Sequence, residues 1–275
     1  MKKFSSPDHC NYELYWGQIL NFIDNNPYIS LLNLWKALNY WDLGPSPEAF
    51  RTNEEAKNIF ISIIENGKEK YISLYDATTL KKNYLSTKLI SQINNSTDLI
   101  IEIGGGWGRN IFASYINFYK IYPDINFIMG EVSTSGQSVC SLIIKNYNLP
   151  ITATYFNYYD WKNVINIIRY KRYKNVCVFS NHSIEQIPHL EYKMSEDFLS
   201  LDLESLKFTH IEPVGFQLKG GSSTYTGKEC YNQNLIPILL QLKNNNKIKI
   251  TESSPDYFSI GGWENCGSLI QWEKI

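Results

Sequence analysis

The stretch DLIIEIGGGWGRN, Asp98 to Asn110, decides the fold of this 275-residue chain. It begins with a short apolar run rich in β-branched residues, which is typical of a strand buried on both faces. Three consecutive glycines follow the run, and Gly108 precedes a helical pattern. Glycine lets the backbone turn tightly and approach a ligand, and a helix that starts there offers free N–H groups. The stretch therefore predicts a nucleotide or nucleoside site at the carboxyl end of a strand.

Downstream, apolar runs alternate with helical patterns of roughly 10–15 residues, which indicates βαβ units and a parallel sheet. The further strand-like runs are INFIMGE (125–131), ITATYFNYYDW (151–161), NVCVFSN (175–181) and LKFTHIEP (206–213). The last two runs, KIKITESSPDYF (247–258) and GSLIQWEKI (267–275), are joined by a turn. We expect them to form an antiparallel hairpin on the edge of the sheet.

Upstream, the pattern favours helices only. Thr52 and Glu55 form a capping box ahead of AKNIFISIIENG (56–67), so we expect a helix there that stops at Gly67. Asp76 is the expected cap of a longer helix that follows. We therefore expect two parts, a helical cap over residues 1–96 and an α/β domain over residues 97–275.

The composition excludes several classes of protein. With 26 Lys+Arg and 27 Asp+Glu the net charge is −1, so no basic excess favours nucleic-acid binding. The 5 cysteines are scattered, which argues against a disulfide scaffold or a zinc ribbon and favours a reducing cytoplasmic setting. No apolar stretch approaches the roughly 20 residues that span a bilayer, and the N-terminus lacks a secretory pattern. Aromatic residues reach 15%, with many in the expected cap.

The cofactor follows from what the glycine loop lacks and what it resembles. A dinucleotide fingerprint needs Gly or Ala where Arg109 stands, and no G-K-[ST] of a P-loop occurs. The acid and alternate glycines at Glu102, Gly104, Gly106 and Gly108 resemble the first motif of class I S-adenosylmethionine-dependent methyltransferases. The resemblance covers roughly residues 97–275. It implies a Rossmann-like, mostly parallel sheet with an antiparallel C-terminal hairpin strand, and S-adenosyl-L-methionine as cofactor.

The resemblance also implies a set of cofactor contacts. Glu131 ends the second strand, 23 residues after Gly108, where the family has an acid on the ribose hydroxyls. Asn157 or Asp160 stands where the family has a polar residue that contacts the adenine. The implied set is Glu102, Gly104, Gly105, Gly106, Gly108, Glu131, Val132, Asn157, Asp160, Ser180 and Asn181. Alternatively, Glu131 is a solvated helix start, and Asn157 and Asp160 only form a turn.

The candidate catalytic residues are His182, Glu185 and Glu212, which follow the fourth and fifth expected strands. A histidine has an ordinary pKa of about 6.5, which suits a general base near neutral pH. Glu185 could orient the imidazole or accept a proton itself, and Glu212 faces the same edge. Alternatively, His182 only caps the helix that follows, Glu185 is a solvated acid, and Glu212 serves only a turn. We expect no metal site, because no acidic pair has tight spacing.

These observations predict a methyltransferase that acts on a small-molecule oxygen. Overall resemblance to bacterial glycan-modifying methyltransferases favours a sugar, glycan-precursor or sugar-nucleotide hydroxyl and a role in polysaccharide biosynthesis. We expect the aromatic cap and the loop at residues 219–225 to enclose the acceptor. Another small-molecule methyltransferase, an aminopropyltransferase and a non-catalytic nucleoside-binding module stay open as alternatives, and the oligomeric state is left open.

Overall fold

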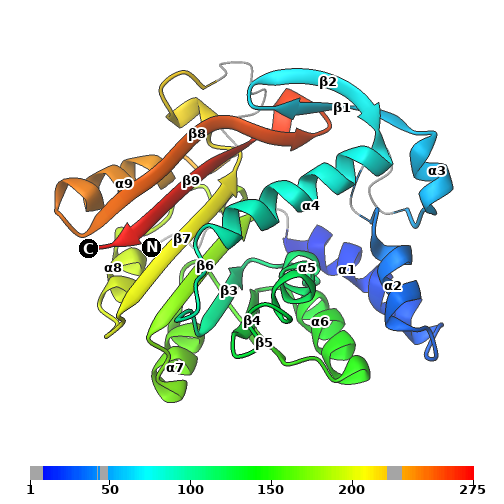
Figure 1. The fold of residues 1–275 in the computed structure, drawn as a ribbon, viewed down its shortest axis with the longest axis horizontal. Helices are drawn as coiled ribbons and strands as arrows, with labels where there is room; N and C mark the ends of the chain where they lie inside the picture. The colour runs from blue at the N-terminus through cyan, green and yellow to red at the C-terminus, as the bar shows by residue number, and fades with distance from the viewer. Residues whose placement is uncertain (1–8, 42, 44–48, 222–230) are drawn as a thin grey trace.

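A computed structural model of the chain describes residues 9–41, 43, 49–221 and 231–275 (Figure 1). In these ranges one mixed sheet has the strand order β2-β1-β8-β9-β7-β6-β3-β4-β5. The strands are β1 Phe60–Glu65, β2 Lys68–Ser73, β3 Leu99–Ile103, β4 Asn126–Glu131, β5 Ile151–Tyr155, β6 Asn175–Asn181, β7 Ser205–Glu212, β8 Ile248–Ile260 and β9 Gly267–Lys274. The α-helices are α1 His9–Asp24, α2 Leu31–Leu38, α3 Asn53–Lys57, α4 Leu74–Ile90, α5 Arg109–Phe118, α6 Thr134–Tyr147, α7 Lys162–Lys171, α8 Tyr192–Leu199 and α9 Leu235–Asn244.

The parallel half of the sheet confirms the expected Rossmann-like fold. Strands β5, β4, β3, β6 and β7 pair in parallel, and β9 pairs antiparallel with both β7 and β8. The C-terminal hairpin is present, but its predicted place on the edge of the sheet is wrong. Strand β8 pairs onward with β1, and β2 forms that edge.

The helix predicted over residues 56–67 is wrong after its first turn. The capping box at Thr52 and Glu55 is present, but α3 ends at Lys57 and β1 begins at Phe60. The turn Asn66-Gly67 has φ values of 50° and 71° and joins β1 to β2. Asn-Gly between β-forming residues is a strong hairpin signal, so Gly67 marks a turn between strands rather than the end of a helix.

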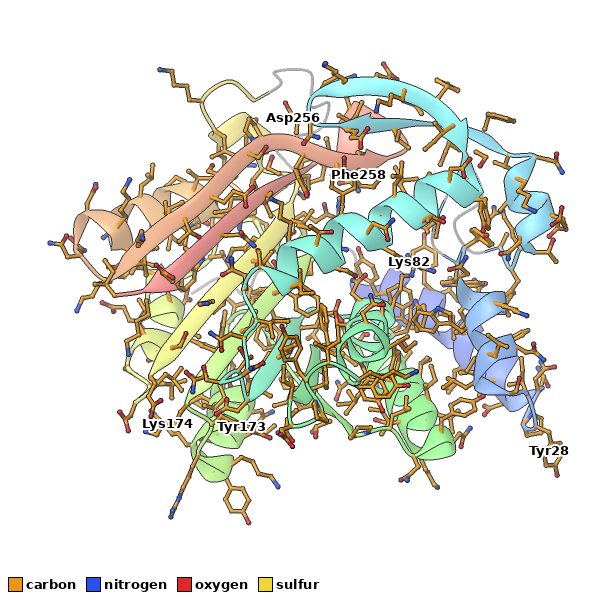
Figure 2. The ribbon with its side chains drawn as sticks, in the orientation of Figure 1. Tyr28, Lys82, Tyr173, Lys174, Asp256 and Phe258 are labelled. Atoms are coloured by element: carbon orange, nitrogen blue, oxygen red, sulfur yellow. The ribbon has the colours of Figure 1, made fainter. Side chains whose placement is uncertain are left out.

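Helix α4 also starts earlier than predicted. Its cap is Ser73, whose Oγ accepts the backbone N–H of Asp76 at 3.1 Å and donates to the Asp76 carboxylate at 2.7 Å. The helix packs beside β8 (Figure 1), and Tyr84 stacks there on Phe258, which Figure 2 labels, with ring centroids 4.8 Å apart. This packing brings the middle of α4 to the same edge of the sheet as the glycine loop.

Two hydrophobic cores cover the two faces of the sheet, because alternate residues of a strand point to opposite faces. Along β3, Ile100 belongs to the core with α1, α2, α4, α5 and α6, while Ile101 belongs to the core with α7, α8 and α9. No helix among the described residues is long and apolar enough to cross a membrane.

Helix α1 is held against the start of α6 by one carboxylate. The backbone N–H groups of Thr134 and Ser135 donate to Glu13 Oε1 and Oε2 at 2.6 and 2.9 Å. An acid is favourable at a helix N-terminus, where N–H groups are free and the dipole is positive. The contact sets α1 above the glycine loop, with Trp16 toward it.

Candidate functional site

The glycine loop adopts a conformation that needs glycine. Gly104, Gly106 and Gly108 have φ values of 68°, 57° and 95°, in the region that side chains disfavour. A Cβ on Gly104 would lie 2.5 Å from Ser183 Cβ, and one on Gly106 would lie 2.9 Å from Trp16 Cζ2. The backbone of the loop therefore lies too close to Ser183 and Trp16 for a side chain to fit at Gly104 or Gly106.

Glu102 supports this loop from behind. Its carboxylate accepts the Asn110 side-chain amide and the Ile111 backbone N–H, both at 2.8 Å. These bonds fasten the end of β3 to the start of α5. Burial raises the pKa of Glu102 to about 8. Its contacts are therefore those of a residue that shapes the loop, and it does not line the cavity described below.

Glu131 holds the other side of the loop. Its Oε2 accepts the Gly106 N–H and its Oε1 accepts the Ser133 N–H, each at 2.8 Å. Each carboxylate oxygen has a second lone pair that these bonds leave open. Because Glu131 also lines the cavity, it can accept hydroxyl donors from a ligand there.

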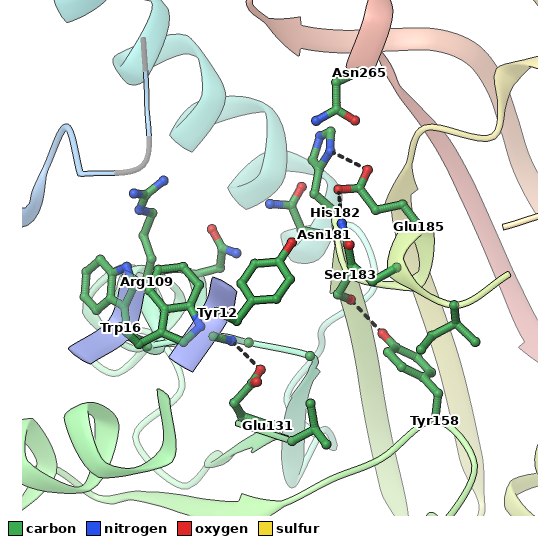
Figure 3. A pocket seen from close by; sticks show the side chains of 18 of the residues that line it. Tyr12, Trp16, Arg109, Glu131, Tyr158, Asn181, His182, Ser183, Glu185 and Asn265 are labelled. Carbon is green, nitrogen blue, oxygen red and sulfur yellow. Dashed lines mark hydrogen bonds and ion pairs between the residues drawn. The ribbon is translucent and has the colours of Figure 1, made fainter. Parts of the chain in front are cut away.

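The glycine loop and Glu131 border a cavity of about 340 Å³ at the carboxyl ends of the parallel strands (Figure 3). This volume is within the usual range for small-molecule sites. It brings together many of the residues predicted from the sequence. Those that line it are Gly104, Gly105, Gly106, Glu131, Val132, Asn181, His182 and Glu185. The others, Glu102, Gly108, Asn157, Asp160, Ser180 and Glu212, are outside its lining.

Asn157 and Asp160 are placed away from the cavity. They bridge to each other across a turn, in which Asn157 Oδ1 accepts the Tyr159 N–H at 2.8 Å. Tyr158 lines the cavity instead, and its hydroxyl lies 2.6 Å from Ser183 Oγ. Tyr158 is not among the residues predicted from the sequence, although it stands between Asn157 and Asp160.

His182 and Glu185 face each other on the cavity wall (Figure 3). His182 has φ 53° and its N–H donates to Ile211 O at 3.0 Å, which turns the chain sharply after β6. Its Nδ1 lies 3.4 Å from Glu185 Oε2, and neither atom makes a hydrogen bond. The Glu185 side chain is only 7% exposed and that of His182 is 20% exposed. Two polar groups are thus held close together and at the cavity.

Glu212 lies behind this pair. Its carboxylate accepts the backbone N–H groups of Ser183 at 3.0 Å and Glu185 at 3.3 Å. Burial, and then the charge of Glu185, raise the pKa of Glu212 to about 7. Its contacts fix the turn that carries His182 and Glu185. In the described part of the chain, no group of three His, Cys, Asp or Glu side chains could hold a metal ion.

Ser180 is buried beside His210. His210 Nδ1 lies 2.9 Å from Ser180 Oγ, and its Nε2 accepts the Trp272 indole N–H at 3.0 Å. Burial lowers the pKa of His210 to about 3. The imidazole is therefore neutral, and this cluster is structural.

His210 should make the protein sensitive to acid. Between pH 6.5 and about 3 the unfolded chain binds a proton at His210 that the folded chain does not, so stability falls as the pH drops below 6.5. At pH 5 the protonation of His210 in the unfolded chain lowers the free energy of unfolding by about 2 kcal/mol. In urea unfolding, wild type should lose free energy of unfolding between pH 7.5 and pH 5. We expect this loss to be smaller by about 2 kcal/mol in His210→Gln and unchanged in His189→Gln, which replaces an exposed histidine. Equal pH dependence in His210→Gln and wild type would contradict this assignment.

The aromatic residues of the N-terminal region divide between the cavity and the core. Tyr12 and Trp16 line the cavity, with their rings stacked at 5.9 Å. Tyr40 and Trp41 are buried, and Trp35 contacts Trp107 at 6.0 Å. In the loop at 219–225, residues 222–225 lie outside the described residues.

Comparison with known proteins gives structural matches only. No family model matches the chain, and no curated protein does. One similar solved structure is the O-methyltransferase from Bacillus cereus in complex with SAH, with 12% identity, 71% of this chain and 81% of that chain covered, and a TM-score of 0.49. A second is geranyl diphosphate methyltransferase with GPP and sinefungin, with 10% identity, coverages of 74% and 80%, and a TM-score of 0.47. A third is the 16S rRNA methylase ArmA, with 14% identity, coverages of 94% and 98%, and a TM-score of 0.45.

The fold itself is recognised from the chain's own features. Five parallel strands are followed by an antiparallel β8–β9 pair in which β9 lies next to β7. The acid and alternate glycines of the first motif stand at the end of β3 in the middle of this sheet. Together the strand order and the glycine motif give this chain the Rossmann-like fold of the class I S-adenosylmethionine-dependent methyltransferases.

Proposed function

We propose that the protein transfers a methyl group from S-adenosyl-L-methionine to an oxygen of a small-molecule acceptor, a hydroxyl of a sugar or glycan precursor. The observation that carries the proposal is the glycine loop with Glu131 on one wall of a cavity whose other wall holds His182. The first wall suits a nucleoside, and the second offers a base to an acceptor.

The residues present fit this cofactor. Gly104 and Gly106, which have positive φ and line the cavity, form a cradle that side chains would fill. Glu131 offers carboxylate lone pairs, the hydrogen-bonding chemistry that ribose hydroxyls need. Val132 and Tyr158 also line the cavity and add apolar surface, which suits a flat base.

When bound, S-adenosylmethionine supplies a methyl group on a positively charged sulfur, and the protein needs to bring an acceptor into line with it. In the proposed mechanism, His182 takes the proton of the acceptor hydroxyl. Glu185 Oε2 faces Nδ1, so a proton held on Nδ1 leaves Nε2 as the basic nitrogen. Glu212 positions both residues through the backbone of their turn.

Binding and transfer test the proposal separately. Calorimetry with S-adenosylhomocysteine should give saturable binding at about micromolar affinity, and no binding to wild type would overturn the proposal. Tighter binding of decarboxylated S-adenosylmethionine would favour an aminopropyltransferase, and binding of NADH would favour an oxidoreductase. Methyl-labelled cofactor should then label a sugar nucleotide or a glycan precursor. Label that enters only RNA would overturn the small-molecule acceptor.

A further inference from the structure

The turn between β8 and β9 reaches the cavity at the proposed base. Strand β9 starts at Gly267, which pairs with Phe258 of β8, so residues 259–266 lie beyond this pair. A Cβ on Gly267 would lie 3.3 Å from His182 Nε2. The imidazole nitrogen that takes the proton in the proposed mechanism therefore faces the start of β9.

Two residues next to this pair line the cavity. Ile260 ends β8, and Asn265 ends the short 3₁₀ helix η4, Trp263–Asn265. In Figure 3 the Asn265 amide lies above the His182 ring, at the end of the cavity away from Glu131. Asn265 is exposed, so a ligand in the cavity can reach its amide. An acceptor whose hydroxyl faces Nε2 would therefore lie next to Asn265.

The turn after β6 offers a matching pair of side chains on the Nδ1 side of His182, where Glu185 lies. Gln186 and Ile187 line the cavity, and they are the last residue and the C-cap of the 3₁₀ helix η1, Ile184–Gln186. Gln186 Nε2 donates to Glu185 Oε1 at 3.0 Å, a bond that uses only one of its N–H groups. Each of the two turns thus brings one amide and one isoleucine to the cavity.

This combination of side chains suits a neutral sugar ring. An amide both donates and accepts hydrogen bonds, as a hydroxyl does, so it can bind a hydroxyl without a net charge. The edge of a sugar ring carries hydroxyls, and its faces carry C–H groups that can pack on apolar side chains. None of the four side chains is charged, so they offer no counter-charge to an ionic group.

We propose that Asn265 and Gln186 bind the two hydroxyls that flank the methylated one on a neutral sugar ring. Ile187 and Ile260 contact the C–H groups of the same ring. The inference rests on the proposed function, because His182 Nε2 defines where the methylated hydroxyl lies. It adds that the methylated carbon has a free hydroxyl on each side, which in a glycoside with hydroxyls at C2, C3 and C4 is C3.

The test uses the methyl glycosides of glucose, galactose, mannose and rhamnose as probes. They are titrated by saturation-transfer difference NMR into protein that holds saturating S-adenosylhomocysteine. At least one should bind wild type at about millimolar affinity. Asn265→Ala and Gln186→Ala should each weaken this binding about fivefold, because each variant removes a neutral hydrogen bond.

The matched control is Asn95→Ala, which removes an amide that is also exposed but does not line the cavity. It should bind the probe as wild type does. The proposal is overturned if no probe binds wild type, or if either amide variant keeps wild-type affinity.

Deoxy analogues show whether the amides touch the sugar. The 2-deoxy and 4-deoxy forms of the probe that binds each lack one hydroxyl beside C3, and each should bind wild type about fivefold more weakly. One of them should bind Asn265→Ala as well as the parent glycoside does, and the other should do so with Gln186→Ala. If the losses from amide and hydroxyl simply add, the amides act only through the structure of the turns, and the proposal fails.

Cofactor binding separates this proposal from the proposed function. S-adenosylhomocysteine should bind both amide variants within about twofold of wild type. A loss of about tenfold in either variant would assign that amide to the cofactor and overturn the proposal. If S-adenosylhomocysteine does not bind wild type, the proposed function fails instead, and the glycosides titrated into the protein alone would still test the two amides.

Discussion

Gly106→Arg is expected to abolish binding of S-adenosylhomocysteine, with an affinity at least about 100-fold below that of wild type. Gly106 has φ 57°, and a Cβ there would lie 2.9 Å from Trp16 Cζ2. Any side chain is therefore strained, and a long one fills the cavity that Gly106 lines. Movement of the loop also weakens the 2.8 Å bond from the Gly106 N–H to Glu131, the proposed ribose acceptor.

The matched control introduces the same side chain nearby. Gly17 lies on α1, a Cβ there meets nothing within 4 Å, and it does not line the cavity. Gly17→Arg should therefore bind S-adenosylhomocysteine as wild type does. Thermal unfolding of both variants shows whether Gly106→Arg is folded. A folded Gly106→Arg that binds with wild-type affinity would show that the cofactor lies elsewhere.

The cofactor wall could be predicted because it depends on local sequence and one general rule. A buried strand, a glycine loop and a helix follow one another between residues 98 and 118. The carboxyl ends of parallel strands meet at one edge, which places Glu131 after β4 and His182 after β6 around the same cavity. Neither position depends on how segments that are far apart in the sequence pack together.

The hairpin β1–β2 does not follow from the capping box, which predicts a longer helix. The box does start α3, but the helix lasts only to Lys57. What decides the following residues is nonlocal, since β1 pairs with β8 and Ile63 lies opposite Ile260. The local signal for the hairpin is the Asn66-Gly67 turn, but a glycine after a helical pattern equally suits the end of a helix.

The acceptor wall could not be predicted because it is built by packing of distant segments. Lys81 reaches the cavity because α4 packs against β8, and Trp16 reaches it because Glu13 fastens α1 to α6. Side-chain direction in a turn is equally hard to infer. The turn after β5 presents Tyr158 to the cavity, whereas Asn157 and Asp160 bridge to each other.

His182→Ala is expected to lower the turnover number by about 10²–10³-fold on the acceptor that the labelling screen identifies, because a positioned general base contributes about that much. The affinity for S-adenosylhomocysteine should stay within about twofold of wild type, since the cradle and Glu131 are intact. A loss in turnover without a loss in cofactor affinity separates a role in proton transfer from a role in binding.

Backbone strain at this position calls for a second variant. His182 has φ 53°, which alanine tolerates poorly and asparagine more readily, so His182→Asn removes the base while it keeps the turn after β6. The exposed His189→Asn is the control and should retain wild-type turnover. If both His182 variants turn over nearly as fast as wild type, the base is another group. If His182→Asn alone keeps its rate, the histidine acts only through the backbone turn that it occupies.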